Sequence, residues 1–385
     1  MKCDFCRTAD LSFIYDVPDS KIGAKIAVCN FCGLVQSIQA EQIEKAKRTV
    51  SISSGADWGN IRHGKGLRLD AAIEILNEQI NWKNTDNILD IGSNRGDFIL
   101  WLNGNYPGKN IVAVEPDRNI IDKYKSLPNV KLYISKLEKV HLQKGFFDLA
   151  YSSHTLEHAA SASAMMEQTL DCLAPDGRLF LEVPNIEAIS LEDNIEEFFM
   201  DKHTFHFNRS LLIAFIKNLG FDLVFANDEK DLFNTTLLFR VARTSDAKPF
   251  KAQDPQLAEK NIQMIKKYRE TLDHNRIRLK QVTENIHQFI DRQKVAFWGG
   301  GRIFDALVRF GGLKSEEVKC LVDGYLYKYV PRSHDVEIRD PEYLKKYEPQ
   351  VVIILARSSA DKIAEKAHGL GIRHVIKFSD LLLSV

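Results

Sequence analysis

The sequence predicts an α/β protein in which two open-sheet domains follow a small cysteine-bearing domain. Residues 60 to about 245 alternate helical and strand-like patterns, and a second block of the same kind begins at 295. Residues 1–45 instead hold all the closely spaced cysteines and show little apolar periodicity. A chain of 385 residues also exceeds one ordinary hydrophobic core, so two or three domains are expected.

The composition argues against nucleic-acid and membrane partners. Lys+Arg and Asp+Glu are equal at 52 each, so no overall electrostatic attraction to either surface is expected. The run VVIILA at 351–356 is long enough for a strand but not for a bilayer span, and the N-terminus lacks the apolar run of a signal peptide. We therefore expect a cytoplasmic protein in a reducing environment, where cysteines bind metals or stay as thiols.

Two C-x-x-C pairs, separated by 22 residues, predict a structural zinc site with the ligands Cys3, Cys6, Cys29 and Cys32. Each pair can supply two corners of a tetrahedron from a tight turn, and the residues between the pairs can return as a small ribbon. Four thiolates leave no open coordination position, so this Zn²⁺ is not expected to act in catalysis. A redox dithiol is the alternative, although neither pair begins a helix of a thioredoxin-like unit.

The stretch NILDIGSNRGDFILWL, residues 87–102, predicts a buried strand, a glycine-bearing turn and a helix. Asp90, Gly92 and Gly96 give the pattern D-x-G-x-x-x-G, in which the glycines let the backbone approach a ligand at the strand end. The next strand, IVAVEP, ends in Glu115, whose carboxylate can accept hydrogen bonds from both ribose hydroxyls of an adenosine. The loop lacks the G-x-G-x-x-G of nicotinamide sites and the Lys-Ser/Thr of a P-loop.

Two further motifs complete an ordered set. FDLAYSSHTLEH at 147–158 ends a strand and enters a helix, and LAPDGRLFLEVPN at 173–185 is a turn that leads into a strand. In this order, over roughly residues 70–245, the motifs resemble class I methyltransferases that depend on S-adenosylmethionine (SAM). The resemblance implies a Rossmann-like domain that binds SAM, with a domain that binds no ligand as the alternative. The implied cofactor contacts are Asp90, Gly92, Ser93, Gly96, Glu115, Pro116, Ser153 and His154.

Over nearly the whole chain the layout is similar to the zinc-containing sugar C-methyltransferases, which alkylate a carbon of a nucleotide-linked deoxy-keto-sugar. The features that carry this resemblance are CGLVQ at 32–36, SSGADWGNIRHGKG at 53–66 and a second α/β domain that begins VAFWGGG. The resemblance implies a small-molecule acceptor, a nucleotide sugar, bound between the middle and C-terminal domains.

The same resemblance assigns catalytic roles to histidines. It places a family histidine on His158, and it places a Tyr-His-Glu-His motif on residues 200–203, where only the last member, His203, is retained. His203 is then the expected general base, which removes a proton alpha to a ketone so that the enolate attacks the SAM methyl. Asp201 and Lys202 replace family residues, so oxygen or nitrogen methylation assisted by His203 or His206 is the alternative.

The stretch DKHTFHF, residues 201–207, is expected to be a loop over the carboxyl edge of the sheet. A helix over 211–219 should follow it, with Asn208 or Ser210 as the N-cap. Three roles stay open for the histidine pair: catalysis, packing, or a metal site completed by Asp201 or Glu197. For His158, a hydrogen bond at the start of a helix is the alternative to a substrate contact.

Residues 255–292 predict one long helix with an apolar stripe interrupted by Asn275. The stripe can pack on its own chain or form the seam of a dimer, so a monomer or a homodimer is expected. From 295, the chain repeats the order seen at 87–115: a strand, a glycine turn, a helix, and a second strand that ends in an acid. The residues are VAFWGGGRIFDALVRFGG followed by VKCLVDG. Amides at the glycines can contact a diphosphate, and the resemblance implies that this domain helps to hold the nucleotide sugar. The expected substrate contacts are Gly299, Gly300, Gly301 and Arg302.

The sequence thus predicts four parts: a zinc-binding ribbon at 1–50, a SAM-binding domain at 51–250, a connector helix at 251–293 and a Rossmann-like substrate domain at 294–385. The expected function is SAM-dependent methylation of a nucleotide-linked keto-sugar, with His203, His158 and His206 as the catalytic candidates. Two alternatives stay open: an O- or N-methyltransferase acting on a surface-glycan precursor or another small polar metabolite, and a non-catalytic SAM-binding scaffold.

Overall fold

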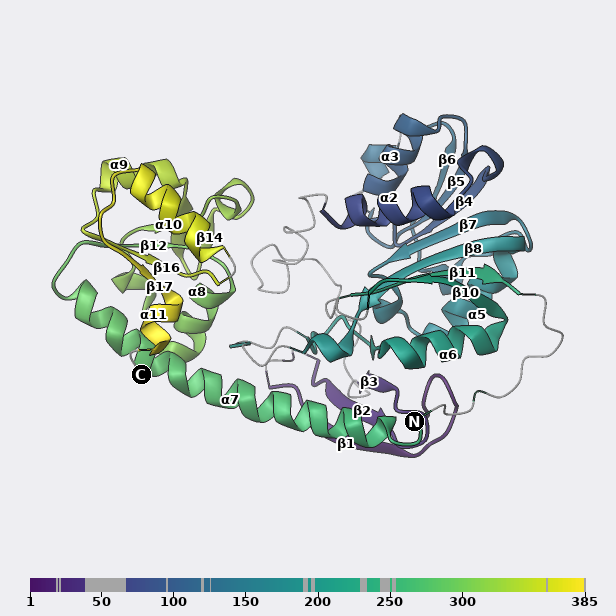
Figure 1. Ribbon diagram of the computed structural model, residues 1–385, viewed down its shortest axis with the longest axis horizontal. Coiled ribbons are helices and arrows are strands. Elements are labelled where there is room, and N and C mark those ends of the chain that lie inside the picture. Colours follow the sequence, from purple (N-terminus) through teal and green to yellow (C-terminus); the bar gives the residue numbers. More distant parts are fainter. Residues whose placement is uncertain are drawn as a thin grey trace. The chain divides into compact units, whose positions relative to one another are not determined.

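The computed structural model describes residues 1–18, 20, 22–38, 67–94, 96–118, 121–124, 126–189, 193–194, 198–228, 234–242, 250, 254–357 and 359–383 (Figure 1). The described residues up to Lys266, without Asp193 and Asn194, form one compact unit, and the others form a second. The stretch SSGADWGNIRHGKG and Glu197 lie outside the described residues. The four-part division of the chain stays a prediction.

The N-terminal residues fold into a small antiparallel sheet, here called the ribbon (residues 1–38). Its strands are β1 (Leu11–Asp16), β2 (Lys25–Cys29) and β3 (Val35–Ile38), in the order β1-β2-β3-β9. The fourth strand, β9 (Phe205–His206), comes from the stretch that carries the two histidines and pairs Val35 with His206. The expectation that both histidines lie in a loop is therefore wrong for His206, because the edge of β3 offers unpaired main-chain groups to this segment.

A seven-stranded sheet forms the centre of the first unit, in the order β10-β11-β8-β7-β4-β5-β6. β11 is antiparallel to both neighbours, and the other strand pairs are parallel. The α/β class expected from the sequence is confirmed. The strands are β4 (Asn87–Ile91), β5 (Asn110–Val114), β6 (Val130–Tyr133), β7 (Phe147–Ser153), β8 (Leu173–Pro184), β10 (Phe221–Ala226) and β11 (Asn234–Val241).

Helices cover both faces of this sheet (Figure 1). α2 (Leu67–Gln79) and α3 (Asp97–Asn105) pack on one face, and α5 (Ala162–Cys172) and α6 (Arg209–Leu219) pack on the other. Burial of these apolar faces on both sides of the parallel strands is the main force that holds the unit together. Short helices are α4 (Ile121–Tyr124), η2 (Trp82–Asn84), η4 (Leu137–Lys139), η5 (Leu156–His158) and η6 (Ile186–Ala188).

The helix after the histidines begins two residues earlier than expected. Asn208 is the N-cap residue, but its side chain makes no capping hydrogen bond. It exchanges two hydrogen bonds with Asn261 instead, at 2.8 and 3.0 Å between side-chain nitrogen and oxygen. Gly220 ends the helix in the left-handed conformation, with φ +116°.

The second unit is built on a six-stranded sheet in the order β14-β15-β13-β12-β16-β17. Only the pair β14–β15 is antiparallel among its described strand pairs. The strands are β12 (Val295–Trp298), β13 (Leu321–Val322), β14 (Arg332–Ser333), β15 (Val336–Arg339), β16 (Val351–Ile354) and β17 (Val375–Lys377). The helices are α8 (Arg302–Ala306), η7 (Leu307–Gly311), η8 (Ser315–Glu317), η9 (Leu326–Lys328), η10 (Pro341–Tyr343), α9 (Leu344–Tyr347), α10 (Ala360–Gly369) and α11 (Phe378–Leu383).

One continuous helix, α7 (Leu257–Ile290), occupies the predicted connector. Its apolar stripe is buried by the chain itself, so the packed-helix alternative holds and the stripe is not free to form a dimer seam. The polar member of the stripe, Asn275, donates from its amide to the Asp193 carbonyl at 2.9 Å. The buried members are Ile265, Tyr268, Leu272, Leu279, Val282 and Ile286.

Among the described residues, no helix is both long and apolar enough to cross a membrane.

Candidate functional site

The loop after β4 is shaped by two glycines with positive φ. Gly92 has φ +75°, and a Cβ there would lie 2.0 Å from Thr155 Oγ1. The same hydroxyl donates to the Ile91 carbonyl at 3.1 Å, which fixes the segment after β7 against this loop. Gly96 has φ +78° and begins α3, where a Cβ would lie 2.8 Å from the Tyr124 hydroxyl. Both positions therefore require glycine for conformation and for space.

Gly92→Ala is expected to lower the free energy of unfolding by at least about 1–3 kcal/mol, the usual cost of a strained backbone conformation, with the Thr155 clash added. Urea unfolding followed by circular dichroism measures the change. Gly104→Ala is the matched control, because Gly104 lies inside α3 with open space around it and alanine favours helix there. A Gly92→Ala protein as stable as the wild type would contradict this account of the loop.

Two buried acids flank the glycine loop at the ends of adjacent parallel strands. Asp90 lies in β4, where burial, with a contribution from the Glu115 charge, raises its pKa well above the ordinary value. Glu115 follows β5, and burial raises its pKa too, opposed by backbone hydrogen bonds. Its two oxygens accept from the Asp117 and Asn94 amides, each at 2.9 Å. Each oxygen retains a lone pair for a ribose hydroxyl, so the donor and acceptor set suits an adenosyl group.

The remaining expected cofactor contacts lie near these acids. Ser93 follows Gly92 in the loop and is buried, and Pro116 follows Glu115. At the end of β7, Ser153 donates from its hydroxyl to Glu182 Oε1 at 2.9 Å. His154 donates its amide to the Glu182 carbonyl at 2.8 Å, and its ring Nε2 lies 3.3 Å from the same carboxylate. Their side chains are therefore engaged with β8, which leaves their backbone as the part able to line a cofactor site.

A buried carboxylate, Glu157, lies at the centre of three histidines. Its Oε1 lies 3.4 Å from His154 Nδ1 and 3.8 Å from His158 Nε2. Its Oε2 is buried and has no hydrogen-bond partner among the described residues. Burial by itself would raise the pKa of Glu157, but the neighbouring His158, His154 and His203 lower it to about 2. Whenever one of these histidines is protonated, Glu157 is therefore ionised and opposes its charge.

His158 and His203 meet beside this carboxylate. Their ring centroids lie 4.9 Å apart, and one donor atom from each of Glu157, His158 and His203 lies within 4.8 Å of the others. His158 donates from Nδ1 to the Lys202 carbonyl at 2.8 Å, and His203 donates from Nδ1 to the Phe198 carbonyl at 3.2 Å. A neutral imidazole that donates from Nδ1 has an unprotonated Nε2, so both rings offer a proton acceptor. We call these three residues the Glu–His–His cluster.

Burial keeps both imidazoles neutral near pH 7. It lowers the pKa of His203 well below the ordinary value, and His158 adds to the effect. It also lowers the pKa of His158, where the Glu157 charge opposes the shift. The cluster can therefore accept a proton or hold a divalent cation, because one carboxylate and two neutral imidazoles suit either role.

Two other side chains of DKHTFHF, those of Asp201 and His206, contact the ribbon. His206 Nε2 lies 2.9 Å from Ser37 Oγ, and burial lowers the His206 pKa to about 3. The Asp201 carboxylate accepts a hydrogen bond from the Ser20 hydroxyl. Among the described residues, Glu157 rather than Asp201 is the carboxylate grouped with His158 and His203. Glu197, the other carboxylate of the metal alternative, lies outside the described residues.

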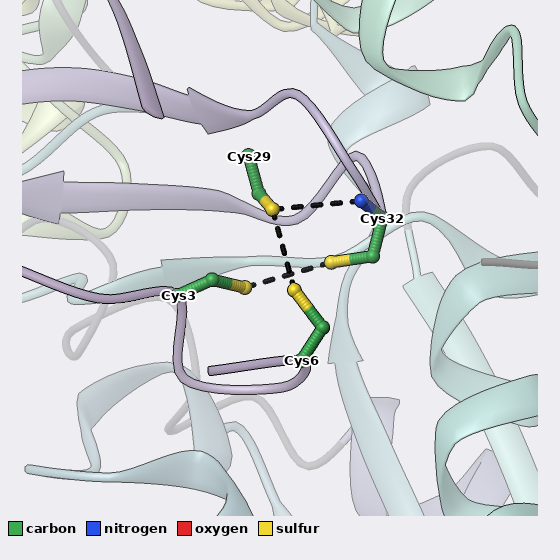
Figure 2. Close-up of side chains that lie close together, drawn as sticks. All are labelled: Cys3, Cys6, Cys29 and Cys32. Carbon is green, nitrogen blue, oxygen red and sulfur yellow. Dashed lines mark hydrogen bonds between the residues drawn. The ribbon is translucent and has the colours of Figure 1, made fainter. Parts of the chain in front are cut away.

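The four paired cysteines converge in the ribbon (Figure 2). The Sγ atoms of Cys3 and Cys32 lie 3.5 Å apart, as do those of Cys6 and Cys29, and all four lie within 4.8 Å of one another. These separations are too long for disulfides, and they are close to the edge of about 3.8 Å of a tetrahedron with Zn–S bonds of about 2.3 Å. The four sulfurs therefore fit a closed zinc site.

Comparison with known proteins agrees with this geometry. Residues 65–225 match a family described as a methyltransferase domain. Over 355 residues the chain is 23% identical to the C-methyltransferase NovU of Streptomyces niveus, and the alignment covers 88% of this chain and 81% of that protein. The chain is a SAM-dependent methyltransferase.

Solved structures with similar folds include two further methyltransferases. The 1,6-didemethyltoxoflavin-N1-methyltransferase of Burkholderia thailandensis is 15% identical, with 61% of this chain and 100% of that chain covered and a TM-score of 0.39. A SAM-dependent methyltransferase from Archaeoglobus fulgidus is 17% identical, with 46% and 94% covered and a TM-score of 0.37. Neither similarity bears on the acceptor of this methyltransferase.

In the second unit of the methyltransferase, Asp323 braces the predicted glycine turn. Its carboxylate accepts hydrogen bonds from three backbone amides: Gly300 at 3.2 Å, Tyr325 at 2.9 Å and Leu326 at 2.8 Å. Gly299 has φ +122°, and a Cβ there would lie 2.7 Å from the Leu355 carbonyl oxygen. Gly301 and Arg302 begin α8. Asp323 therefore shapes the turn, and the role of these glycines toward a substrate stays a prediction.

Sequence reasoning about the methyltransferase missed three residues of the site. Glu157 lies between two candidate histidines in HTLEH, and nothing in the sequence shows that its carboxylate is buried. Thr155 locks the glycine loop, and Ser37 contacts His206 from 169 positions away. The position of Glu157 beside His158 was the one available signal, because adjacent ionisable residues at a strand end often share a site.

Proposed function

We propose that this methyltransferase moves the SAM methyl group to a carbon alpha to the ketone of a nucleotide-linked keto-sugar, with His203 as the general base. The observation that carries the proposal is the Glu–His–His cluster: His203 has an unprotonated Nε2 beside a second imidazole and a buried carboxylate. The similarity to a C-methyltransferase supports transfer to carbon. The glycine turn at Gly299–Arg302 is the proposed contact for the diphosphate of the acceptor.

Each part of the first unit has a task in this proposal. SAM, when bound, supplies a methyl group on a sulfonium, and S-adenosylhomocysteine is the leaving group when the enolate carbon takes the methyl. Glu115 would accept hydrogen bonds from the ribose hydroxyls, and the glycine loop would let the cofactor approach the backbone closely. His203 Nε2 removes the alpha proton of the acceptor, and the nearby Glu157 carboxylate stabilises the imidazolium that forms. The ribbon cysteines would hold a structural Zn²⁺ with no open coordination position.

One observation favours a second candidate, methyl transfer to oxygen or nitrogen. Burial lowers the pKa of His203 well below its ordinary value, which makes it a weaker base toward a carbon acid. A hydroxyl or amine acceptor demands less of the base, because a positioned lone pair already attacks the methyl group. The two candidates differ in whether hydrogen alpha to a carbonyl exchanges with solvent.

Solvent exchange therefore tests the proposal. The protein is incubated in D₂O with S-adenosylhomocysteine and a nucleoside-diphosphate-linked deoxy-keto-sugar, and deuterium at the alpha carbon is followed by NMR. Exchange that depends on the protein supports carbon methylation. No exchange with a panel of keto-sugars, together with SAM turnover on a hydroxyl acceptor, would assign oxygen transfer. Activity that is lost with EDTA and restored by Mg²⁺ or Mn²⁺, while the zinc content stays at one per chain, would instead assign the Glu–His–His cluster to a metal.

Glu115→Ala is expected to raise the dissociation constant of SAM at least about tenfold, because two hydrogen bonds to a charged acceptor are lost. Isothermal titration calorimetry measures the affinity. Glu74→Ala is the control, since Glu74 is an exposed acid in α2. Equal affinity in Glu115→Ala and the wild type would remove Glu115 from the cofactor site.

A further inference from the structure

The segment that carries His203, residues 198–206, has little regular structure of its own. Its one strand is the two-residue β9, which exists by pairing with β3 of the ribbon. Two internal hydrogen bonds hold His203: its amide donates to the Met200 carbonyl at 2.9 Å, and its Nδ1 donates to the Phe198 carbonyl. The segment must therefore take most of its conformation from what surrounds it.

On one side the ribbon contacts this segment through side chains and main chain. The Tyr15 ring meets Phe199 edge-on, with centroids 6.0 Å apart, and the Ser20 hydroxyl donates to Asp201. The Ser37 amide donates to the Thr204 carbonyl at 2.8 Å, and the Ser37 hydroxyl bonds His206 Nε2. The ribbon thus touches the segment from position 199 to position 206.

On the other side lies η5, with Glu157 and His158. The Thr204 amide donates to the Glu157 carbonyl at 2.7 Å, and His158 holds the Lys202 carbonyl. The segment is therefore clamped between the ribbon and the short helix that supplies the other members of the Glu–His–His cluster. Loss of the ribbon would remove the contacts on one side of this segment and leave those to η5.

The ribbon is a fixed support because it is itself bound to the catalytic core. The Asp4 carboxylate accepts from the Ser163 amide and the Ser161 hydroxyl, both at 2.7 Å, at the start of α5. The Phe5 ring stacks on Phe215 of α6 with centroids 3.6 Å apart. Asn261 of α7 donates to the Gly33 carbonyl at 2.8 Å. A support held by three helices can transmit a defined position to the segment.

We propose that the ribbon is a working part of the acceptor site, and that Ser37 is a positioning residue that fixes the His203 segment through His206. This rests on the proposed function only in giving His203 its chemical role. Ser37 is suited to the task because it binds the segment twice, through its amide and its hydroxyl. His206 connects Ser37 to His203, because the centroid of its ring lies 5.6 Å from that of Phe198 and 6.2 Å from that of His203.

The test is Ser37→Ala in the full chain, with Ser12→Ala as the matched control. The Ser12 hydroxyl bonds Asn30 on the exposed side of the same ribbon. Hydrogen–deuterium exchange of residues 198–206 and ¹⁵N NMR of the histidine rings report the segment without any acceptor. In Ser37→Ala we expect hydrogen exchange of this segment to be at least about tenfold faster than in the wild type. The His203 ring should then populate both neutral tautomers instead of one. The affinity for SAM should stay within twofold of the wild type. Ser12→Ala should match the wild type in all three.

The effect on catalysis is measured as the rate at which the alpha hydrogen of the keto-sugar exchanges for deuterium. Ser37→Ala should lower kcat at least about tenfold, and Ser37→Thr, which keeps the hydroxyl, should restore most of it.

Unchanged exchange, tautomer and kcat in Ser37→Ala would overturn the proposal and leave the ribbon as a separate module. If Ser37→Ala loosens the segment but catalysis proves independent of His203, the positioning stands and the proposed base fails. Should Ser37→Ala lose SAM binding through misfolding, Ser20→Ala, which removes the Asp201 contact, replaces it with the same readouts.

Discussion

Cys29→Ser is expected to abolish stoichiometric zinc binding and to unfold the ribbon. Cys29 lies at the end of β2 with no exposed surface, and its Sγ faces Cys6 and accepts from the Cys32 amide. A structural zinc contributes on the order of 10 kcal/mol of apparent binding energy in small domains, far more than this short sheet can supply by burial. Since the ribbon clamps the His203 segment, methyl transfer should be lost along with the metal.

Metal analysis of the purified protein and hydrogen exchange of residues 1–38 measure the two effects. Cys172→Ser is the control, because Cys172 is a buried thiol of α5 whose pKa is raised by burial to about 11. It should keep one zinc per chain and a protected ribbon. A wild-type protein that contains no zinc, or a Cys29→Ser protein with an intact ribbon, would contradict the assignment of the metal.

Sequence reasoning predicted the local structure correctly where its signals lie close together in the chain. The glycine loop, its flanking strand and the acid at the end of the next strand follow one another within 30 residues, and each has a specific conformational or electrostatic requirement. The spacing within and between the two cysteine pairs is itself typical of a zinc site. The stripe of α7 was visible because an apolar period near 3.6 repeats over many turns. Such signals need no knowledge of which distant segments meet.

The parts that the sequence did not reveal depend on contacts between distant segments. β9 has two residues, too few for an alternating pattern, and it forms only because β3 presents a free edge. The partnership of Ser37 with His206, and that of Glu157 with His203, join residues far apart in the chain that share no motif. Asn208 has the composition of a capping residue but pairs with Asn261 of α7. Tertiary contacts there override a sound local preference.

His203→Gln is expected to lower the rate of alpha-hydrogen exchange and of methyl transfer by about 10²–10⁴-fold, the usual contribution of a general base. Glutamine keeps a donor for the Phe198 carbonyl and a similar volume, so SAM affinity should stay within twofold. Kinetics with the keto-sugar and calorimetry with SAM separate the two. His141→Gln is the control, because His141 is exposed and outside the cluster.

The dependence of kcat/KM on pH distinguishes a catalytic His203 from one that only packs. Burial holds the pKa of His203 well below its ordinary value, so the base is active at neutral pH and wild-type kcat/KM should fall only as the pH approaches that lowered pKa, well below about 6.5. His203→Gln should lose this acid limb. Stability begins to decline at higher pH. Buried His158, His203 and His206 have lowered pKa values, so the unfolded chain binds more protons, and stability present above about pH 6.5 is lost as the pH falls toward the folded-state pKa values. Fluorescence must therefore show a folded protein at each pH, and an acid limb that persists in folded His203→Gln would assign the base to another group.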